Sequence, residues 1–258
     1  MDWSGLAGAD NIETLPVLPG WVTAAPGEAP EKVAFLSGAA LAHLHLVLAS
    51  KKVSQSLLLD RLALRAAEAC MAFAGRPERA GELRDALHLL RPGDLPGPAG
   101  EIYLAWRRMA ERSVSVQALH RALPELEAAT IADRLDAGRD APITRAATVL
   151  DGVLTQAPRA DVSGLILADA ALAQALEWSH PVPLLAAGLR HGDLRKREED
   201  LRHACHHAVT VSAIAAARLA TNLARRAARR RAGRRHVPAA SGVVAACTRS
   251  ANEPFSRF

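Results

Sequence analysis

Hydrophobic residues recur along most of this chain at the spacing of helices. Apolar positions follow one another at steps of three, four and seven residues, and short groups of Pro and Gly divide these periodic stretches. The pattern predicts an all-α protein. We expect a multi-helix orthogonal bundle or a solenoid-like helical stack with one long carboxy-terminal helix.

The same pattern divides the chain into three parts. Residues 1–30 hold four prolines and no periodic pattern, which predicts an irregular leader that wraps the body. Residues 31–232 predict a single helical domain. Residues 233–258 turn to Pro, Ser, Gly and scattered single residues, which is typical of a disordered tail.

Two helices are expected to organise the domain. Residues 31–50 are apolar on nearly every side, which predicts a buried central helix. Their longest apolar run, Val33 to Ala49, is shorter than the ~20 apolar residues that cross a bilayer, so no membrane contact is expected. The second helix is predicted to begin at a cap on Asp193, to reach Ala232 and to pack an apolar stripe on the body.

Composition agrees with helices and indicates a reducing compartment. Half of the residues are hydrophobic, mostly Ala and Leu, and only 3% are aromatic, which favours helices over sheets. Three cysteines stand far apart, at Cys70, Cys205 and Cys247, in no pairing pattern. The amino terminus has no basic segment followed by an apolar run, so no secretory signal is expected. These features predict a cytoplasmic protein.

The net charge of +5 is concentrated in one stretch, residues 218–235, which holds eight arginines. Without them the chain has 24 basic and 27 acidic residues, so the body is mildly acidic. The stretch could neutralise phosphates and bind nucleic acid weakly and without sequence preference, although no aromatic residue lies nearby to stack on bases. The candidate residues are Arg225, Arg226, Arg229, Arg230, Arg231, Arg234 and Arg235. The alternative is a solvated helix end, where cations also favour the helix dipole.

The best metal candidate lies early in the long helix. The candidate ligands of zinc or iron are Glu199, His203, His206 and His207. His203 and His207 are one helical turn apart, a spacing at which two imidazoles can share one ion. However, this face is predicted to lie opposite the apolar stripe, and no second cluster of matching spacing exists. A polar, solvated helix face without a cofactor is therefore the favoured interpretation.

Two further patterns are best explained structurally. His43 and His45 point about 200° apart on a helix, so they cannot readily share an ion, and a hydrogen-bonded core histidine is expected. Residues 115–138 have the length of a helix-turn-helix, but the second helix is mostly acidic and would be repelled by phosphates. We expect a structural helical hairpin there.

No motif of nucleotide binding, nucleophilic hydrolysis or metalloproteolysis is found, so an enzyme is not favoured. The leading hypothesis is a non-enzymatic scaffold or interaction protein, with a protein partner or a homo-oligomer at a surface apolar groove lined by the first and the long helices. The alternatives are a metal-dependent enzyme at the His cluster and accessory nucleic-acid binding by the arginines.

Several long strings of the chain resemble an uncharacterised family of alphaproteobacteria, the domain of unknown function 1403. The strings include FLSGAALAHLHLVLA from Phe35, GRPERAGELRDALHLLRPGDLPGPAGEIYLAWRR from Gly75 and DLRKREEDLRHACHHA from Asp193. The resemblance covers roughly residues 30–230 and implies one helical body in a bacterial cytoplasm. It supplies no activity and no catalytic residue. Family members continue differently after the Arg-rich helix, which suggests a frameshift or truncation near Arg229 to Gly233 in this chain.

Overall fold

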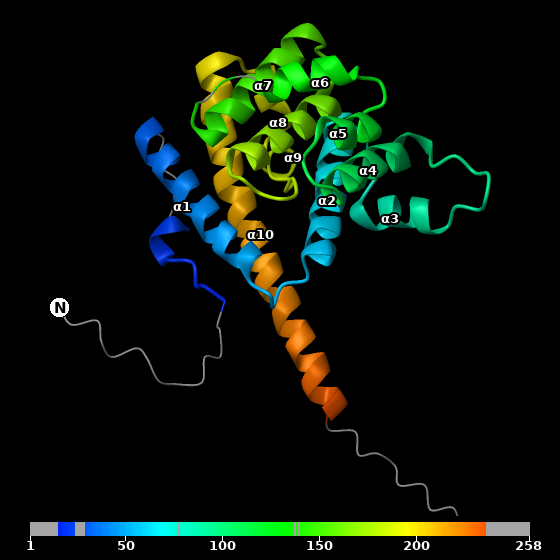
Figure 1. Cartoon of the computed structure of the whole chain (residues 1–258), viewed down its shortest axis with the longest axis vertical. Helices are drawn as coiled ribbons and strands as arrows, with labels where there is room; N and C mark the ends of the chain where they lie inside the picture. Colours follow the sequence, from blue (N-terminus) through cyan, green and yellow to red (C-terminus); the bar gives the residue numbers. More distant parts are fainter. Residues whose placement is uncertain (1–14, 24–28, 77, 137, 139, 236–258) are drawn as a thin grey trace, which may run out of the picture. The chain divides into compact units, whose positions relative to one another are not determined.

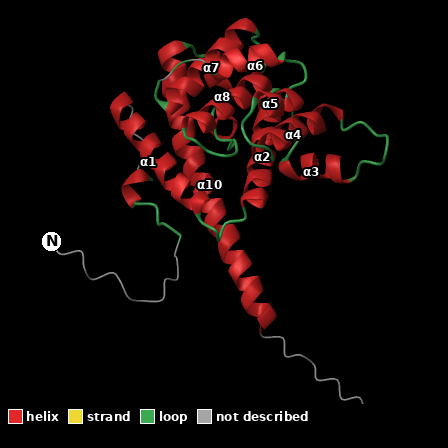
Figure 2. Cartoon of the chain, in the orientation of Figure 1, coloured by secondary structure: helices red, strands yellow, loops and turns green. Residues whose placement is uncertain are grey.

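The computed structural model describes residues 15–23, 29–76, 78–136, 138 and 140–235, and every regular element in these residues is helical (Figures 1 and 2). The α-helices are α1 (Pro30–Ala49), α2 (Gln55–Phe73), α3 (Ala80–His88), α4 (Gly97–Ala110), α5 (Val116–Ala122), α6 (Ala128–Leu135), α7 (Pro142–Gln156), α8 (Asp161–Ala175), α9 (Leu185–Gly188) and α10 (Glu198–Arg235). Two 3₁₀ turns, η1 (Gly20–Val22) and η2 (His191–Arg195), complete them. The predicted all-α bundle with a long carboxy-terminal helix is confirmed.

The chain divides into two compact units after Ala224. The first holds α1 to α9 and the greater part of α10. The second begins at Arg225, and its described residues continue α10 to Arg235. The predicted domain limits, 31 and 232, stay a prediction. Most of the predicted disordered tail, from residue 236 onward, lies outside the described residues.

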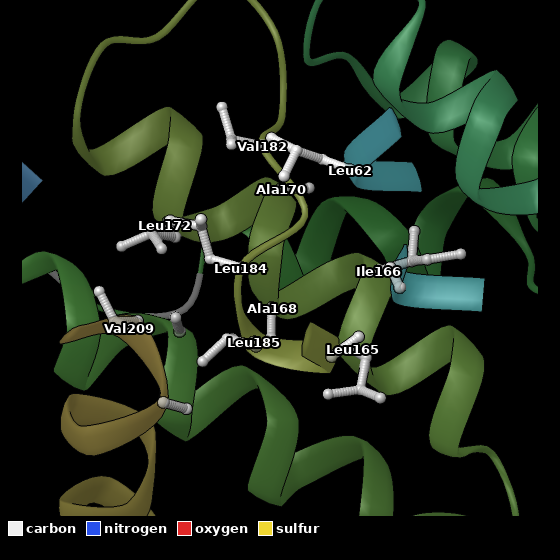
Figure 3. Close-up of a cluster of buried hydrophobic side chains, with 14 of the residues drawn as sticks. Leu62, Leu165, Ile166, Ala168, Ala170, Leu172, Val182, Leu184, Leu185 and Val209 are labelled. Carbon is white, nitrogen blue, oxygen red and sulfur yellow. The ribbon is translucent and has the colours of Figure 1, made fainter. Parts of the chain in front are cut away.

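Helix α8 is the centre of the first unit. Its residues from Ser163 to Ala173 are all buried, so neighbours cover it on every side. Figure 3 shows Leu165, Ile166 and Leu172 of α8 among apolar side chains from elsewhere in the chain. Helix α7 packs closely along it, because a Cβ at Gly164 would lie 3.2 Å from Leu150 and 3.3 Å from Val153.

A buried carboxyl group fixes the segment that follows α8. Asp169 is fully buried and accepts hydrogen bonds from the backbone N–H groups of Leu184 (3.2 Å) and Leu185 (3.1 Å). These donors stand at the start of the short helix α9, where a helix has no internal acceptors for them. Asp169 therefore joins α8 to α9 and orients Leu184 and Leu185 into the core (Figure 3).

Helix α1 is not the central helix that its composition predicts. It lies at the edge of the first unit, beside the first turns of α10 (Figure 1). Its inner face, which includes Leu36, Leu44 and Val47, is buried. Its outer face is exposed although it is also apolar. The prediction of a buried core helix is therefore wrong for the outer face of α1, where Trp21 of η1 stacks on Phe35 but the face stays largely exposed.

Helix α4 begins at Gly97, where Pro98 in the first turn needs no hydrogen bond for its nitrogen. Two other expectations are modified. Asp193 does not cap the long helix but accepts from the N–H of Arg190 within η2, and α10 begins at Glu198. Within the leader, residues 15–23 pack on the body, with Val22 buried; the remainder up to residue 28 lies outside the described residues.

Candidate functional site

An apolar groove runs beside α1. One wall is α1 itself, with Gly38, Ala42 and Leu46, and the other includes Pro142 at the start of α7 and Trp178 after α8. The groove has a volume of about 620 Å³, which is within the range of ligand sites, and its lining is almost entirely apolar. Helix α10 contributes His206. A surface apolar groove along the first helix is therefore present, but its second wall comes mainly from α7 and the segment after α8 rather than, as was expected, from the long helix.

A hydrogen bond between α1 and α10 forms the floor of this groove. The hydroxyl of Ser37 and Nδ1 of His206 are 2.7 Å apart, and the same hydroxyl lies 2.7 Å from the carbonyl oxygen of Ala34. The Ser37 side chain is fully buried, and burial lowers the pKa of His206, with Arg202 acting in the same direction. The neutral imidazole and the hydroxyl thus satisfy one another and join the two helices.

This pair is a poor nucleophile and base. Covalent catalysis needs donors that stabilise a developing oxyanion next to the nucleophile. Ser37 lies in the interior of α1, where backbone N–H groups are occupied by the helical hydrogen bonds, and its hydroxyl also contacts the Ala34 carbonyl. The hydrogen bond therefore positions α1 against α10.

Aromatic side chains border the groove and the outer face of α1. The indole N–H of Trp178 donates to Nδ1 of His45 at 2.9 Å. On the other flank, Trp21 of η1 stacks on Phe35 with ring centroids 5.5 Å apart. Trp21, Phe35 and Leu46 keep 52%, 64% and 57% of their surface exposed, so this side of α1 is an unusually open apolar surface. The sequence predicted a hydrogen-bonded histidine in the core. His45 is hydrogen-bonded, but it is exposed rather than in the core.

A hollow of about 230 Å³ adjoins the groove and shares His45 and Trp178 with it. A second hollow, of about 520 Å³, shares Leu59 and His180 with the first and contains the buried phenol of Tyr103, whose hydroxyl donates to Asp60 at 2.9 Å. Arg107 lies there between Asp60 and Glu111. Because Asp60 and Glu111 share this one guanidinium, the hollow keeps one negative charge in excess.

The predicted metal ligands do not come together as a cluster. Glu199 forms an ion pair with Arg202, and His206 turns toward Ser37 in the groove. The rings of His203 and His207 meet edge to face with centroids 5.7 Å apart. In the described part of the chain, no three His, Cys, Asp or Glu side chains lie where they could hold one metal ion. Metal binding by this face stays a prediction.

The comparisons with known proteins identify the family. The family described as "Protein of unknown function (DUF1403)" matches residues 7–245. The chain belongs to this family. Comparison with curated proteins and with solved structures gave no significant match. DUF1403 membership therefore supports the resemblance noted in the sequence, and it brings no activity to any residue.

The arginine candidates of this DUF1403 protein lie at the end of α10. Arg225 and Arg226 are exposed, as are Arg229, Arg230 and Arg231. Arg234 and Arg235 are the last helical residues, and the positions of their side chains lie outside the described structure. Nucleic-acid binding by this stretch likewise stays a prediction.

Sequence reasoning missed the most distinctive parts of the site. Ser37 and His206 are 169 residues apart, and Trp178 and His45 are 133 apart, so no local spacing announces either pair. A signal for the exposed surface was present in residues 30–49, which are apolar on opposite faces of the helix. Such a helix is either central or exposes an apolar face that no other element covers. Contrary to the expectation from the run Val33 to Ala49, α1 is long and apolar enough, by length and composition alone, to span a membrane, although 39% of its most apolar window is buried and core helices of globular proteins share these properties.

Proposed function

We propose that this protein is a non-enzymatic interaction module whose binding surface is the outer face of α1 together with the groove beside it. The observation that carries the proposal is the exposure of Phe35, Leu46 and Trp21 next to an apolar groove. Large exposed apolar patches on folded proteins mark interaction sites, because leaving them in water costs free energy.

A protein partner fits this surface better than a small polar substrate does. Small-molecule sites combine an apolar lining with a few unsatisfied polar groups that orient the ligand. Here the polar groups of the groove are already used, since Ser37 bonds to His206 and Trp178 bonds to His45. What remains is apolar area, which suits the apolar face of a protein segment.

Photocrosslinking tests the proposal directly. A photoreactive amino acid replaces Leu46 in the full chain, and the matched control carries it at Leu89, an exposed leucine just after α3. We expect illumination in cells to give a discrete protein adduct from position 46 and none from position 89. Absence of any adduct from position 46, or an adduct with lipid alone, would contradict the proposal.

We also propose an alphaproteobacterial cytoplasmic setting. Support comes from the family resemblance and from Cys70 and Cys205, which are both buried free thiols, as expected in a reducing compartment. The frameshift near Arg229 to Gly233 is a separate proposal, and the family match to residue 245, beyond that point, counts against it. Resequencing of the coding region is its test: the same frame, with relatives that share the tail, would refute it.

Nucleic-acid binding is the second candidate function. Its support is the exposure of five arginines within seven residues, from Arg225 to Arg231. Such a surface binds phosphates by releasing counterions, so affinity should fall steeply as salt rises and should not depend on base sequence. A chain ending at Ala224 should lose this binding. Retained affinity in that shortened chain would exclude the arginines as its cause.

A further inference from the structure

The outer face of α1 has a regular arrangement of small and large residues. Gly38 and Ala42 lie on its midline, one turn apart, and both are exposed. The larger Phe35 and Leu46 stand one turn further out, toward opposite ends of the helix. A second helix could therefore approach closely at the centre, where there is no bulky side chain, and meet larger apolar groups toward both ends.

This arrangement is nearly symmetrical about residue 40. If a second α1 lay across the first in the antiparallel direction, Gly38 of each copy would face Ala42 of the other, and Phe35 would meet the end that carries Leu46. Each contact would then occur twice, as in an interface with two-fold symmetry. The outer face of α1 is thus complementary to itself.

Charges at the two ends of α1 favour the antiparallel direction. Glu31 is exposed on the midline of the outer face at the amino end, and Lys51 and Lys52 are exposed just beyond the carboxy end. Lys32 points about 100° further round the helix, away from that midline. Antiparallel pairing brings the Glu31 of one copy to the lysines of the other at both ends, whereas parallel pairing places like charges together.

We propose that two copies of this chain associate through the outer faces of their α1 helices, packed antiparallel around Gly38 and Ala42. This inference rests on the proposed function, of which it names the partner. The groove beside α1 then receives apolar side chains of the second copy, and the exposed surface of Phe35 and Leu46 is covered in solution.

Substitution of Gly38 is the sharpest test. A Cβ at Gly38 meets no atom within 4 Å and the position is exposed, so a leucine there can extend into solvent in the single chain, and glycine is a poor helix former. In the dimer the leucine would stand between the two helices. The matched control is Gly81→Leu in α3, where a Cβ likewise meets nothing within 4 Å.

Light scattering and sedimentation of the full chain give the readout. We expect a dimer for the original chain and for Gly81→Leu, and a monomer with unchanged helical circular dichroism for Gly38→Leu. A monomeric original chain at every concentration, or a Gly38→Leu variant that remains as dimeric as the control, would overturn the inference.

Charge reversal tests the direction of packing. Glu31→Lys should raise the dissociation constant roughly two- to thirtyfold, because each dimer loses two exposed ion pairs. The Lys51→Glu, Lys52→Glu double variant should weaken it similarly, and the triple variant should restore association. The charge control is Glu101→Lys in α4, an exposed position on another helix, which should have no effect. If the triple variant were no tighter than the single one, antiparallel packing would be excluded.

The crosslink at Leu46 separates failure of this inference from failure of the proposed function. An adduct of the chain with itself, at twice the chain mass, supports both. An adduct with a different protein supports the interaction module and overturns self-association. No adduct overturns both.

Discussion

Gly188, the last residue of α9, lies directly against the backbone of Ala208 in α10. A Cβ at position 188 would stand 2.6 Å from the Ala208 carbonyl carbon, closer than real Cβ contacts come. The absence of a side chain is what allows α9 to dock on α10, and α9 in turn brings Leu185 into the core.

We therefore expect Gly188→Ala to lower the free energy of unfolding by about 1–3 kcal/mol, since backbone atoms must move to admit the methyl group. Urea unfolding followed by circular dichroism measures the change. Gly192→Ala in η2 is the matched control, because a Cβ there meets nothing within 4 Å. Equal stability of the two variants would show that α9 does not need this close approach.

Asp169 should make stability fall as pH rises. Burial raises the pKa of this carboxyl to about 8, although the N–H groups of Leu185 and Leu184 act in the opposite direction. The folded chain keeps the proton up to about pH 8, whereas the unfolded chain releases it near its ordinary value of 3.8. Between these pH values the unfolded state binds fewer protons than the folded state. The stabilisation that Asp169 gives at low pH is therefore lost as pH rises, and the free energy of unfolding falls by up to about 1.4 kcal/mol per pH unit.

Urea unfolding at a series of pH values, for the original chain and for Asp169→Asn, isolates this contribution. The variant should be less stable at low pH, because its amide nitrogen cannot accept the hydrogen bond that Leu184 or Leu185 donates. Its stability should also lack the downward slope. His43, His206 and His207, whose pKa values burial lowers, act the opposite way but equally in both chains. Identical slopes would refute the assignment.

Tyr103 should ionise only at strongly alkaline pH. It is the single tyrosine of the chain, so the ultraviolet absorbance of phenolate reports on it alone. Burial and then the hydrogen bond to Asp60 raise its pKa to about 12, from an ordinary value of 10.0. We expect the titration midpoint of the folded chain to lie well above that of the chain in denaturant. Asp60→Asn should lower the midpoint, and a folded-state midpoint near 10 would contradict the buried hydrogen bond.

The two thiols of the core should resist modification. Cys70 and Cys205 are buried, and burial raises the pKa of the Cys70 thiol to about 12 and raises that of Cys205 as well. Because the thiolate is the reactive form, a Cys247→Ser chain should react with a disulfide reagent only after denaturant is added. Leu89→Cys in the same background serves as an exposed control that reacts at once. Rapid reaction of two thiols in the native chain would show that the core opens readily.

Much of the fold could be predicted from the sequence, because helical periodicity and breaking residues are local signals. The hairpin from α5 to α6 is an example: Ser115 accepts from the N–H of Ala118 at 3.2 Å and starts α5 as its residue type predicts. The choice of the central helix could not be predicted. Both α1 and α8 are apolar all round, and which of them is enclosed depends on how distant elements pack.

The candidate site shows the same division. The local spacing of His203, His206 and His207 suggested a metal, but His206 is used by Ser37 of a helix far away in the sequence. The apolar surface of the first helix indicated that a groove would lie along it, but the second wall, which includes Pro142 and Trp178, could not be predicted. The hydrogen bonds that fill its polar positions depend on tertiary structure and have no signature along the chain.

The enclosure of α8 constrains how this sequence can change over generations. Its central residues are mostly Ala, Gly and Leu packed on every side, with Gly164 against α7 and Ala168 and Ala170 fully buried. Most replacements at the small positions add atoms where there is no space for them. Viable substitutions should therefore accumulate slowly along α8. The outer face of α1, by contrast, is free to vary wherever no partner covers it, so the rate at which Gly38 and Ala42 drift is itself a record of whether something binds there.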